Sequence, residues 1–171
     1  MAISLAYIMP FCLILASIND AVNMKIPNKV ILTLLGSFPL VAFYFGIGSR
    51  QLLMHLAASG LILLPGFVLY LIDQVGAGDV KLLSASALWF GLSEELLQFL
   101  ILASVFGALL VLIVFAARLV TRRKIALITI LPTYVLVGKK VPYGIAICCG
   151  GLIAFPNSVI MQLALDRMPV P

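Results

Sequence analysis

Residues 96–117 read LLQFLILASVFGALLVLIVFAA, a run without a charged side chain. A helix of about 20 mostly apolar residues can cross the hydrocarbon core of a bilayer, so this run predicts a transmembrane helix. Five other segments of the chain have a similar apolar character. The six candidate segments are 2–18, 30–47, 52–72, 79–92, 96–117 and 143–164.

The composition agrees with a chain built for lipid. Of its 171 residues, 64% are hydrophobic and 10% are charged, whereas a soluble domain carries about 25% charged residues. We expect an all-α integral membrane protein in contact with membrane lipid, in which residues 1–171 form a single polytopic domain. The net charge of +5 does not indicate a nucleic-acid partner, because the placement of Lys and Arg matters more than their sum in a membrane protein.

The basic residues predict the orientation. Sorted by alternate loops, nine fall on one side and two, Arg50 and Arg167, on the other, so the positive-inside bias makes the first side cytoplasmic and puts both termini outside. The first 24 residues contain no Lys or Arg, so we expect the first segment to be a retained span. The nine are Lys25, Lys29, Lys81, Arg118, Arg122, Arg123, Lys124, Lys139 and Lys140.

The stretch 125-IALITILPTYVLV-137 lies between two basic clusters and contains Pro132. It is short for a span, and a crossing there would place Lys139 and Lys140 on the outer side. We therefore expect an interfacial or re-entrant element, with a thin seventh span as the alternative.

Asp79 lies in 75-VGAGDVKLL-83, at the start of the fourth segment. A helix from Asp79 to Ser93 is about 22 Å long, against a hydrocarbon core of about 30 Å. We expect a short fourth helix with 76–78 as a non-helical approach, so that either the bilayer thins there or Asp79 lies somewhat below the membrane surface. A carboxylate at such a depth is a functional candidate, although the spacing fits an ordinary helix cap equally well.

Asp20 supplies a second carboxylate on the same predicted side, at the end of the first segment. Pro27 stops a helix and Asn28 is suited to cap the next one, so a tight turn is expected to hold Asp20 near the surface. Two neighbouring carboxylates keep one proton between them. The charged one can take a proton from water while the protonated one polarises a peptide carbonyl.

The remaining reactive residues have ordinary interpretations. Cys12, Cys148 and Cys149 lack the spacing of a zinc site, and His55 has no second His or Cys nearby in sequence, so we expect packed side chains and no metal or other cofactor. Glu94 and Glu95 follow Ser93 as in a capped, acidic first turn. Asp73 is expected to be a surface or capping residue.

Three motifs together resemble the type IV prepilin peptidases, which belong to the GxGD class of membrane aspartyl proteases. They are 20-DAVNMKIPN-28, 76-GAGDVKL-82 and 141-VPYGIA-146. The resemblance implies an enzyme that removes the leader of prepilin or pilin-like precursors at the cytoplasmic face of the bacterial inner membrane, with Asp20 and Asp79 as the catalytic pair. It implies supporting roles for Gly76, Gly78, Lys81, Pro27, Asn28, Pro142, Tyr143 and Gly144.

The chain is more compact than the larger members of that family. It lacks their cytoplasmic insertion with paired CxxC motifs, so methyltransferase activity is not expected, and its size resembles the peptidases of tight-adherence (Flp) pili. Two other functions stay open. One is an archaeal preflagellin-type GxGD peptidase, and the other is a small ion- or proton-coupled transporter that uses intramembrane aspartates.

Overall fold

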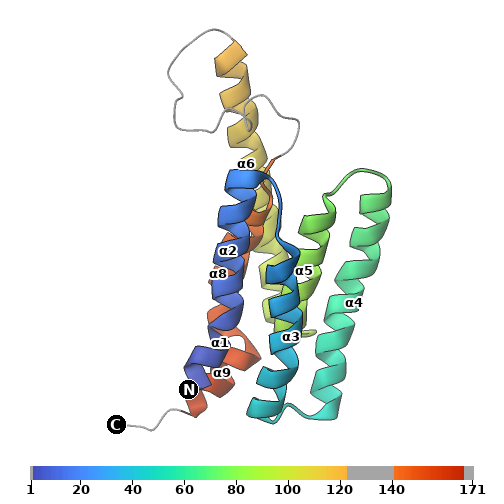
Figure 1. Ribbon diagram of the computed structural model, residues 1–171, viewed down its shortest axis with the longest axis vertical. Coiled ribbons are helices and arrows are strands. Elements are labelled where there is room, and N and C mark those ends of the chain that lie inside the picture. Colours follow the sequence, from blue (N-terminus) through green and yellow to red (C-terminus); the bar gives the residue numbers. More distant parts are fainter. Residues whose placement is uncertain (1, 123–140, 168–171) are drawn as a thin grey trace.

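The computed structural model describes residues 2–122 and 141–167, and over these residues the chain is helical. The predicted interfacial or re-entrant element at 125–137 lies outside them. Figure 1 shows the helices side by side, mostly along one direction. The elements are α1 (Ala2–Ala6), α2 (Ile8–Asn23), α3 (Asn28–Phe45), α4 (Ser49–Leu71), α5 (Ala77–Phe90), α6 (Glu94–Arg122), α8 (Gly144–Ala154), η1 (Phe155–Asn157) and α9 (Val159–Asp166).

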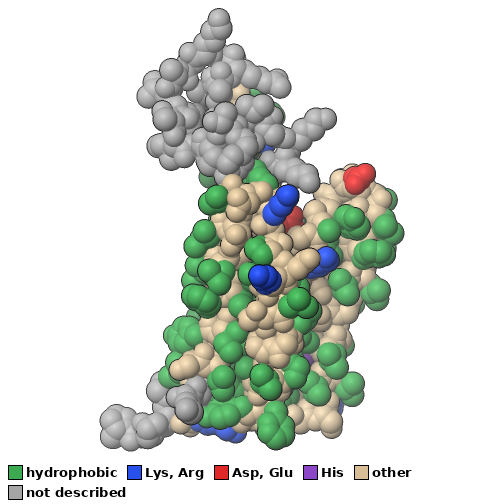
Figure 2. All heavy atoms as spheres, in the orientation of Figure 1, with side chains coloured by type: hydrophobic (Ala, Val, Ile, Leu, Met, Phe, Trp, Pro, Cys, Tyr) green, Lys and Arg blue, Asp and Glu red, His purple; other side chains and the backbone are tan. Residues whose placement is uncertain are grey.

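Several helices are long enough to span a membrane, which confirms the predicted all-α membrane fold. Four described stretches are long and apolar enough to cross a membrane, and α8 to α9 form a fifth if this pair, bent by 44°, is one span. The remaining predicted segment, the fourth, is α5, whose 14 residues extend about 21 Å. Figure 2 shows hydrophobic side chains over the flanks, with the visible acidic side chains toward the upper end. The four stretches are Ile3–Asn23, Asn28–Phe45, Ser49–Leu71 and Glu94–Leu119.

The first segment is interrupted early and extends further than predicted. A turn at Tyr7 separates α1 from α2, because Pro10 has no N–H to donate to the carbonyl of Ala6. The helix then continues past the predicted end at Ile18 to Asn23. The polar residues Ser17 and Asn19 do not terminate the helix, because their side chains donate hydrogen bonds to carbonyls of the preceding turn.

The last segment was predicted as a span over 143–164, and in the structure this segment is bent by 44°. The helix changes to the short 3₁₀ element η1, which contains Pro156, and α9 then starts in a new direction. The side chain of Ser158 caps the new helix by accepting from the N–H of Met161. Pro156 removes a helical donor at the break, which accounts for the bend.

The short helix α5 is held by its neighbours along its length. Residues 84–90 are all buried. The indole N–H of Trp89 donates to the carbonyl of Leu34 on α3 at 3.1 Å, and Nδ1 of His55 on α4 lies 2.8 Å from the carbonyl oxygen of Leu88. Since a carbonyl only accepts, this geometry requires the proton on Nδ1. The second half of the helix that carries Asp79 is therefore fixed in the core.

Helix α8 approaches α6 closely because Gly150, at the contact, has no side chain. A Cβ at Gly150 would lie 2.7 Å from the backbone nitrogen of Ala103, so only glycine permits this backbone contact. The first turn of α8 then faces α2. The α2–α3 turn, the α4–α5 loop and the start of α8 meet at one end of the bundle, called here the site end.

Candidate active site

Asp20 lies in the last turn of α2 and is buried, with 6% of its surface exposed. Its Oδ2 accepts a hydrogen bond of 2.8 Å from the backbone N–H of Gly144. Gly144 is the first residue of α8, and the N–H groups at a helix start lie at the positive end of the helix dipole. A buried carboxylate is thus held by a helix from the other end of the sequence.

The contact between Asp20 and α8 requires glycine at residue 144. A Cβ there would lie 2.9 Å from Oδ2 of Asp20 and 3.0 Å from its Cβ. Tyr143 is the N-cap of α8, but its side chain makes no cap hydrogen bond. Asp20 therefore takes the place of a local capping side chain.

Asp79 is the third residue of α5 and is half-buried. Its side chain lies against Gly76, where a Cβ would be 2.8 Å from Oδ2 of Asp79. Gly76 is the N-cap residue of this helix, and its side-chain-free backbone is extended. The carboxylate thus lies over the start of its own helix, as acidic side chains in a first turn commonly do.

The two aspartates belong to the same end of the bundle. A Cβ at Gly78 would lie 3.3 Å from Cβ of Ile26, so the first turn of α5 packs on the turn that follows Asp20. The expected non-helical stretch 76–78 is shorter than predicted, because α5 already begins at Ala77. Gly76 and Gly78 therefore serve close approach, one to Asp79 and the other to Ile26.

Tyr143 connects the surroundings of both aspartates. Its backbone neighbour Gly144 binds Asp20, while burial and, second, the negative charge of Asp79 raise the pKa of its own hydroxyl. The hydroxyl also donates to the carbonyl of Ala103 on α6, at a long 3.4 Å. Consecutive residues of one turn thus bind Asp20 and respond to the charge of Asp79.

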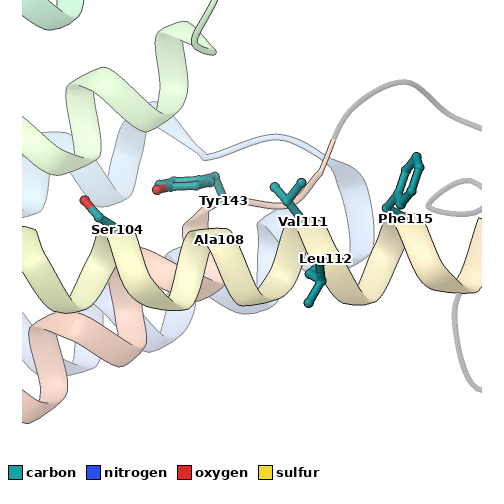
Figure 3. A pocket seen from close by; sticks show the side chains of 7 residues that line it. Ser104, Ala108, Val111, Leu112, Phe115 and Tyr143 are labelled. Carbon is teal, nitrogen blue, oxygen red and sulfur yellow. The ribbon is translucent and has the colours of Figure 1, made fainter.

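An open pocket of about 510 Å³ borders the ring of Tyr143 along α6. Figure 3 shows the ring lying over this helix, with its hydroxyl directed toward the Ser104 side. The pocket is apolar except near Ser104 and the tyrosine hydroxyl. Its lining consists of Ser104, Gly107, Ala108, Val111, Leu112, Phe115 and Tyr143.

Other predicted supporting residues lie around this group. Pro142 is buried, Pro27 is half-buried, and Lys81 and Asn28 are exposed. The prediction that Asn28 caps the second span is wrong. Pro27 is the N-cap residue of α3 and Asn28 is the first residue of the helix, and the N-cap makes no side-chain hydrogen bond. Asp73 is exposed in a left-handed conformation with φ of 56°, which agrees with a surface position after α4.

Sequence reasoning missed Gly107 and Ala103, which α6 contributes to the surroundings of Tyr143. A Cβ at Gly107 would overlap the ring of Tyr143, and Ala103 supplies the carbonyl that the hydroxyl contacts. One signal was present, since Gly107 is the sole glycine of α6. An isolated glycine inside a helix commonly marks close packing.

Histidine and cysteine residues do not gather at this site. His55 is buried against α5, as predicted for a packed histidine, and Cys12 and Cys148 are buried. Within residues 2–122 and 141–167, no three His, Cys, Asp or Glu side chains are arranged to hold a metal ion.

Comparison with protein families gave a match to one family model that covers more than half of the chain. The model of the type IV leader peptidase family matches residues 7–112, a region that includes Asp20 and Asp79 and ends before Tyr143 and Gly144. Comparisons with curated proteins and with solved structures gave no match.

Proposed function

Because the chain belongs to the type IV leader peptidase family, we propose that it is an aspartyl endopeptidase that cleaves the leader from prepilin-like precursors. Asp20 and Asp79 are its catalytic pair. The observation that carries this proposal is the position of the Tyr143–Gly144 turn. The backbone N–H of Gly144 donates a hydrogen bond of 2.8 Å to Asp20, and the turn lies within the electrostatic influence of Asp79.

The pair acts on a water molecule between the two side chains. One carboxylate is ionised and takes a proton from water, while its protonated partner donates to the carbonyl oxygen of the scissile peptide. The oxygen of the deprotonated water attacks the carbonyl carbon of the peptide and forms the new C–O bond. The tetrahedral intermediate then breaks its C–N bond as the leaving amine accepts a proton from the pair.

The environment of Asp20 supports this chemistry. A buried carboxylate without partners would be costly in a membrane protein, and the N–H of Gly144 fixes one of its oxygens. The other oxygen then has a defined direction for water or substrate. Preorganised groups of this kind lower a reaction barrier because they do not need to reorient as charge develops.

The membrane fold and the charge distribution support the proposed substrate and location. The apolar segment of a pilin-like precursor would lie in the bilayer beside the helices, with its leader at the site end. Lys25, Lys29 and Lys81 belong to that end, so the positive-inside rule makes it cytoplasmic, in a bacterial inner membrane.

Reporter fusions after Arg50 and at the C-terminus should both report a location outside the cytoplasm. A cytoplasmic C-terminus would contradict this orientation.

The short turn between α2 and α3 supports a peptidase without methyltransferase activity, as in tight-adherence pilus systems. The test uses purified protein in detergent with a full-length prepilin. Wild-type protein should release the leader in the presence of a metal chelator, whereas Asp20→Asn and Asp79→Asn should each lose roughly a thousandfold or more of the rate.

Asp73→Asn is the matched control, because Asp73 is an exposed carboxylate after α4. This variant should cleave at nearly the wild-type rate. Cleavage that stops with chelator and returns with zinc would overturn the aspartyl mechanism, as would near-normal activity of a stable Asp20→Asn or Asp79→Asn variant.

A further inference from the structure

Helix α8 contacts both α2 and α6, and on each side its contacts are made by residues seven positions apart. Toward α2, Gly144 meets Asp20, and a Cβ at Gly151 would overlap the side chain of Leu13. Residues seven apart lie on the same face of a helix. One face of α8 therefore lies directly against α2, with Asp20 at its start.

Toward α6, the contacts of α8 are made by Tyr143 and Gly150. A Cβ at Gly107 of α6 would overlap the ring of Tyr143, which lies along that helix (Figure 3). A Cβ at Gly150 would lie 2.7 Å from the backbone nitrogen of Ala103, whose carbonyl accepts from the Tyr143 hydroxyl at a long 3.4 Å. Gly107 and Ala103 are one turn apart, so neighbouring positions of α6 fix both the place of α8 and its rotation.

The contact at Tyr143 is directly connected to the contact at Asp20. Tyr143 has helical backbone angles and its carbonyl accepts from the N–H of Ile147 at 3.1 Å, so it already belongs to the first turn of α8. Pro142 before it is buried, and its ring fixes φ. The next residue, Gly144, donates the 2.8 Å hydrogen bond to Oδ2 of Asp20. A displaced tyrosine ring therefore displaces the N–H that binds the carboxylate.

We propose that Gly107 and the ring of Tyr143 are positioning residues for Asp20, because the space left by the missing side chain of Gly107 sets where the N–H of Gly144 lies. The inference rests on the proposed function of Asp20. A hydrogen bond from a backbone N–H favours the ionised form of a carboxylate and fixes its orientation. Neither Gly107 nor the ring needs to touch the substrate for this role.

The first test compares Gly107→Ala with wild type in the prepilin cleavage assay. The methyl group would push the ring of Tyr143 away from α6, so kcat should fall about tenfold with KM changed by less than about threefold. Gly60→Ala places a methyl group in open space on another long helix and should cleave like wild type. A wild-type kcat in folded Gly107→Ala would overturn the inference.

Variants of the ring show whether Gly107 acts through Tyr143. In Tyr143→Ala the start of α8 loses its contact with α6, so kcat should again fall about tenfold. Gly107→Ala added to Tyr143→Ala should cost little more, because no ring is left to push. Tyr143→Phe keeps the ring and should lose about threefold at most. Losses from Gly107→Ala and Tyr143→Ala that multiply would overturn the inference.

The comparison of Tyr143→Phe with Tyr143→Ala also covers the case in which Gly107→Ala does not fold. If the two variants are equally slow, the ring is not the group that positions Asp20, and the inference fails.

The pH–rate profile separates a lost hydrogen bond from a general loss of stability. A carboxylate without its donor is harder to ionise, so the profile of Gly107→Ala should move to higher pH. An unmoved profile would contradict the role assigned to Gly107. The substitution adds no charge, α6 has no charged residue between Glu95 and Arg118, and the titratable groups on the other elements around Asp20 are all retained. These are Lys25, Lys29, Asp79, Lys81, Tyr143, Cys148 and Cys149.

A second readout does not require activity. In protein made with isotope-labelled glycine, the amide resonance of Gly144 can be identified by its absence in Gly144→Ala. It should move upfield in Asp20→Asn and in Gly107→Ala, because the bond to a charged acceptor is lost or weakened. A resonance that moves in Asp20→Asn but not in Gly107→Ala would overturn the inference. If Asp20→Asn itself cleaves normally, the proposed function fails instead, so the two failures are distinguishable.

Discussion

At the end of the bundle opposite the site, side chains satisfy helix termini in ordinary ways. Ser93 and Ser158 cap α6 and α9 by accepting from N–H groups three residues later. His55 binds the carbonyl of Leu88 near the end of α5, and Arg167 donates to the carbonyls of Tyr44 and Phe45, where α3 ends. These contacts hold the helix ends in place and satisfy the N–H and carbonyl groups that they bind.

At the site end, the helices that begin there have no side-chain cap of their own, as is also the case for α4 at the opposite end. The N-cap residues of α3, α5 and α8 are Pro27, Gly76 and Tyr143, and none makes a side-chain cap bond. The start of α8 is instead bound by Asp20 from α2, and Asp79 lies over the start of α5. Carboxylates thus occupy places that serine or asparagine would fill in a purely structural design. The comparison separates polar groups that hold helix ends in place at one end from the carboxylates that we propose as the reactive centre at the other.

The largest effect short of removing a carboxylate is expected from Gly144→Ala. Its methyl group would fall 2.9 Å from Oδ2 of Asp20, so Asp20 or the start of α8 must move. A displacement of about 1 Å at a reacting group costs about a hundredfold in rate. We expect such a loss in the prepilin assay, with protein still present in the membrane fraction.

Gly60→Ala is again the matched control, since a Cβ there meets open space. Thermal unfolding in detergent should be recorded for both variants. Wild-type cleavage by Gly144→Ala would show that the contact between Asp20 and α8 is a structural cap like those of the opposite end.

A smaller and different effect is expected from His55→Leu. The change leaves the buried carbonyl of Leu88 without the donor at 2.8 Å, which should lower the free energy of unfolding by about 1–3 kcal/mol. Cleavage per folded molecule should stay within about twofold of wild type. Denaturation in detergent and the cleavage assay measure the two quantities separately.

A loss of activity in folded His55→Leu comparable with that of Gly144→Ala would remove the distinction between the ends. The short helix α5 would then transmit changes from His55 to Asp79. A loss of stability alone agrees with the separation of roles.

Much of the helical arrangement was predictable, because apolar runs and short polar turns are local features. The capped start of α6 at Ser93 and the shortness of α5 were both predicted and are observed. The break at 155–157 was not predicted, although Pro156 gave a local signal. Apolar composition alone does not distinguish a straight span from a bent one.

The candidate site was predictable in part. The motifs pointed to Asp20 and Asp79, but the bond between Asp20 and Gly144 joins residues far apart in sequence, and no local pattern specifies such a pair. Gly107 was missed for the same reason, since its role depends on the ring of Tyr143 from another helix. Long-range contacts of this kind require the packed structure.

If Asp20 and Asp79 act as one unit, a variant that lacks both carboxylates should reveal it. Cleavage of a full-length prepilin should be measured for Asp20→Asn, Asp79→Asn and the combination, with the amount of folded enzyme matched in detergent. We expect the double variant to be about as slow as either single variant, because losing one member already disables the pair. A double variant slower by the product of the two single losses would show independent contributions and contradict the shared mechanism.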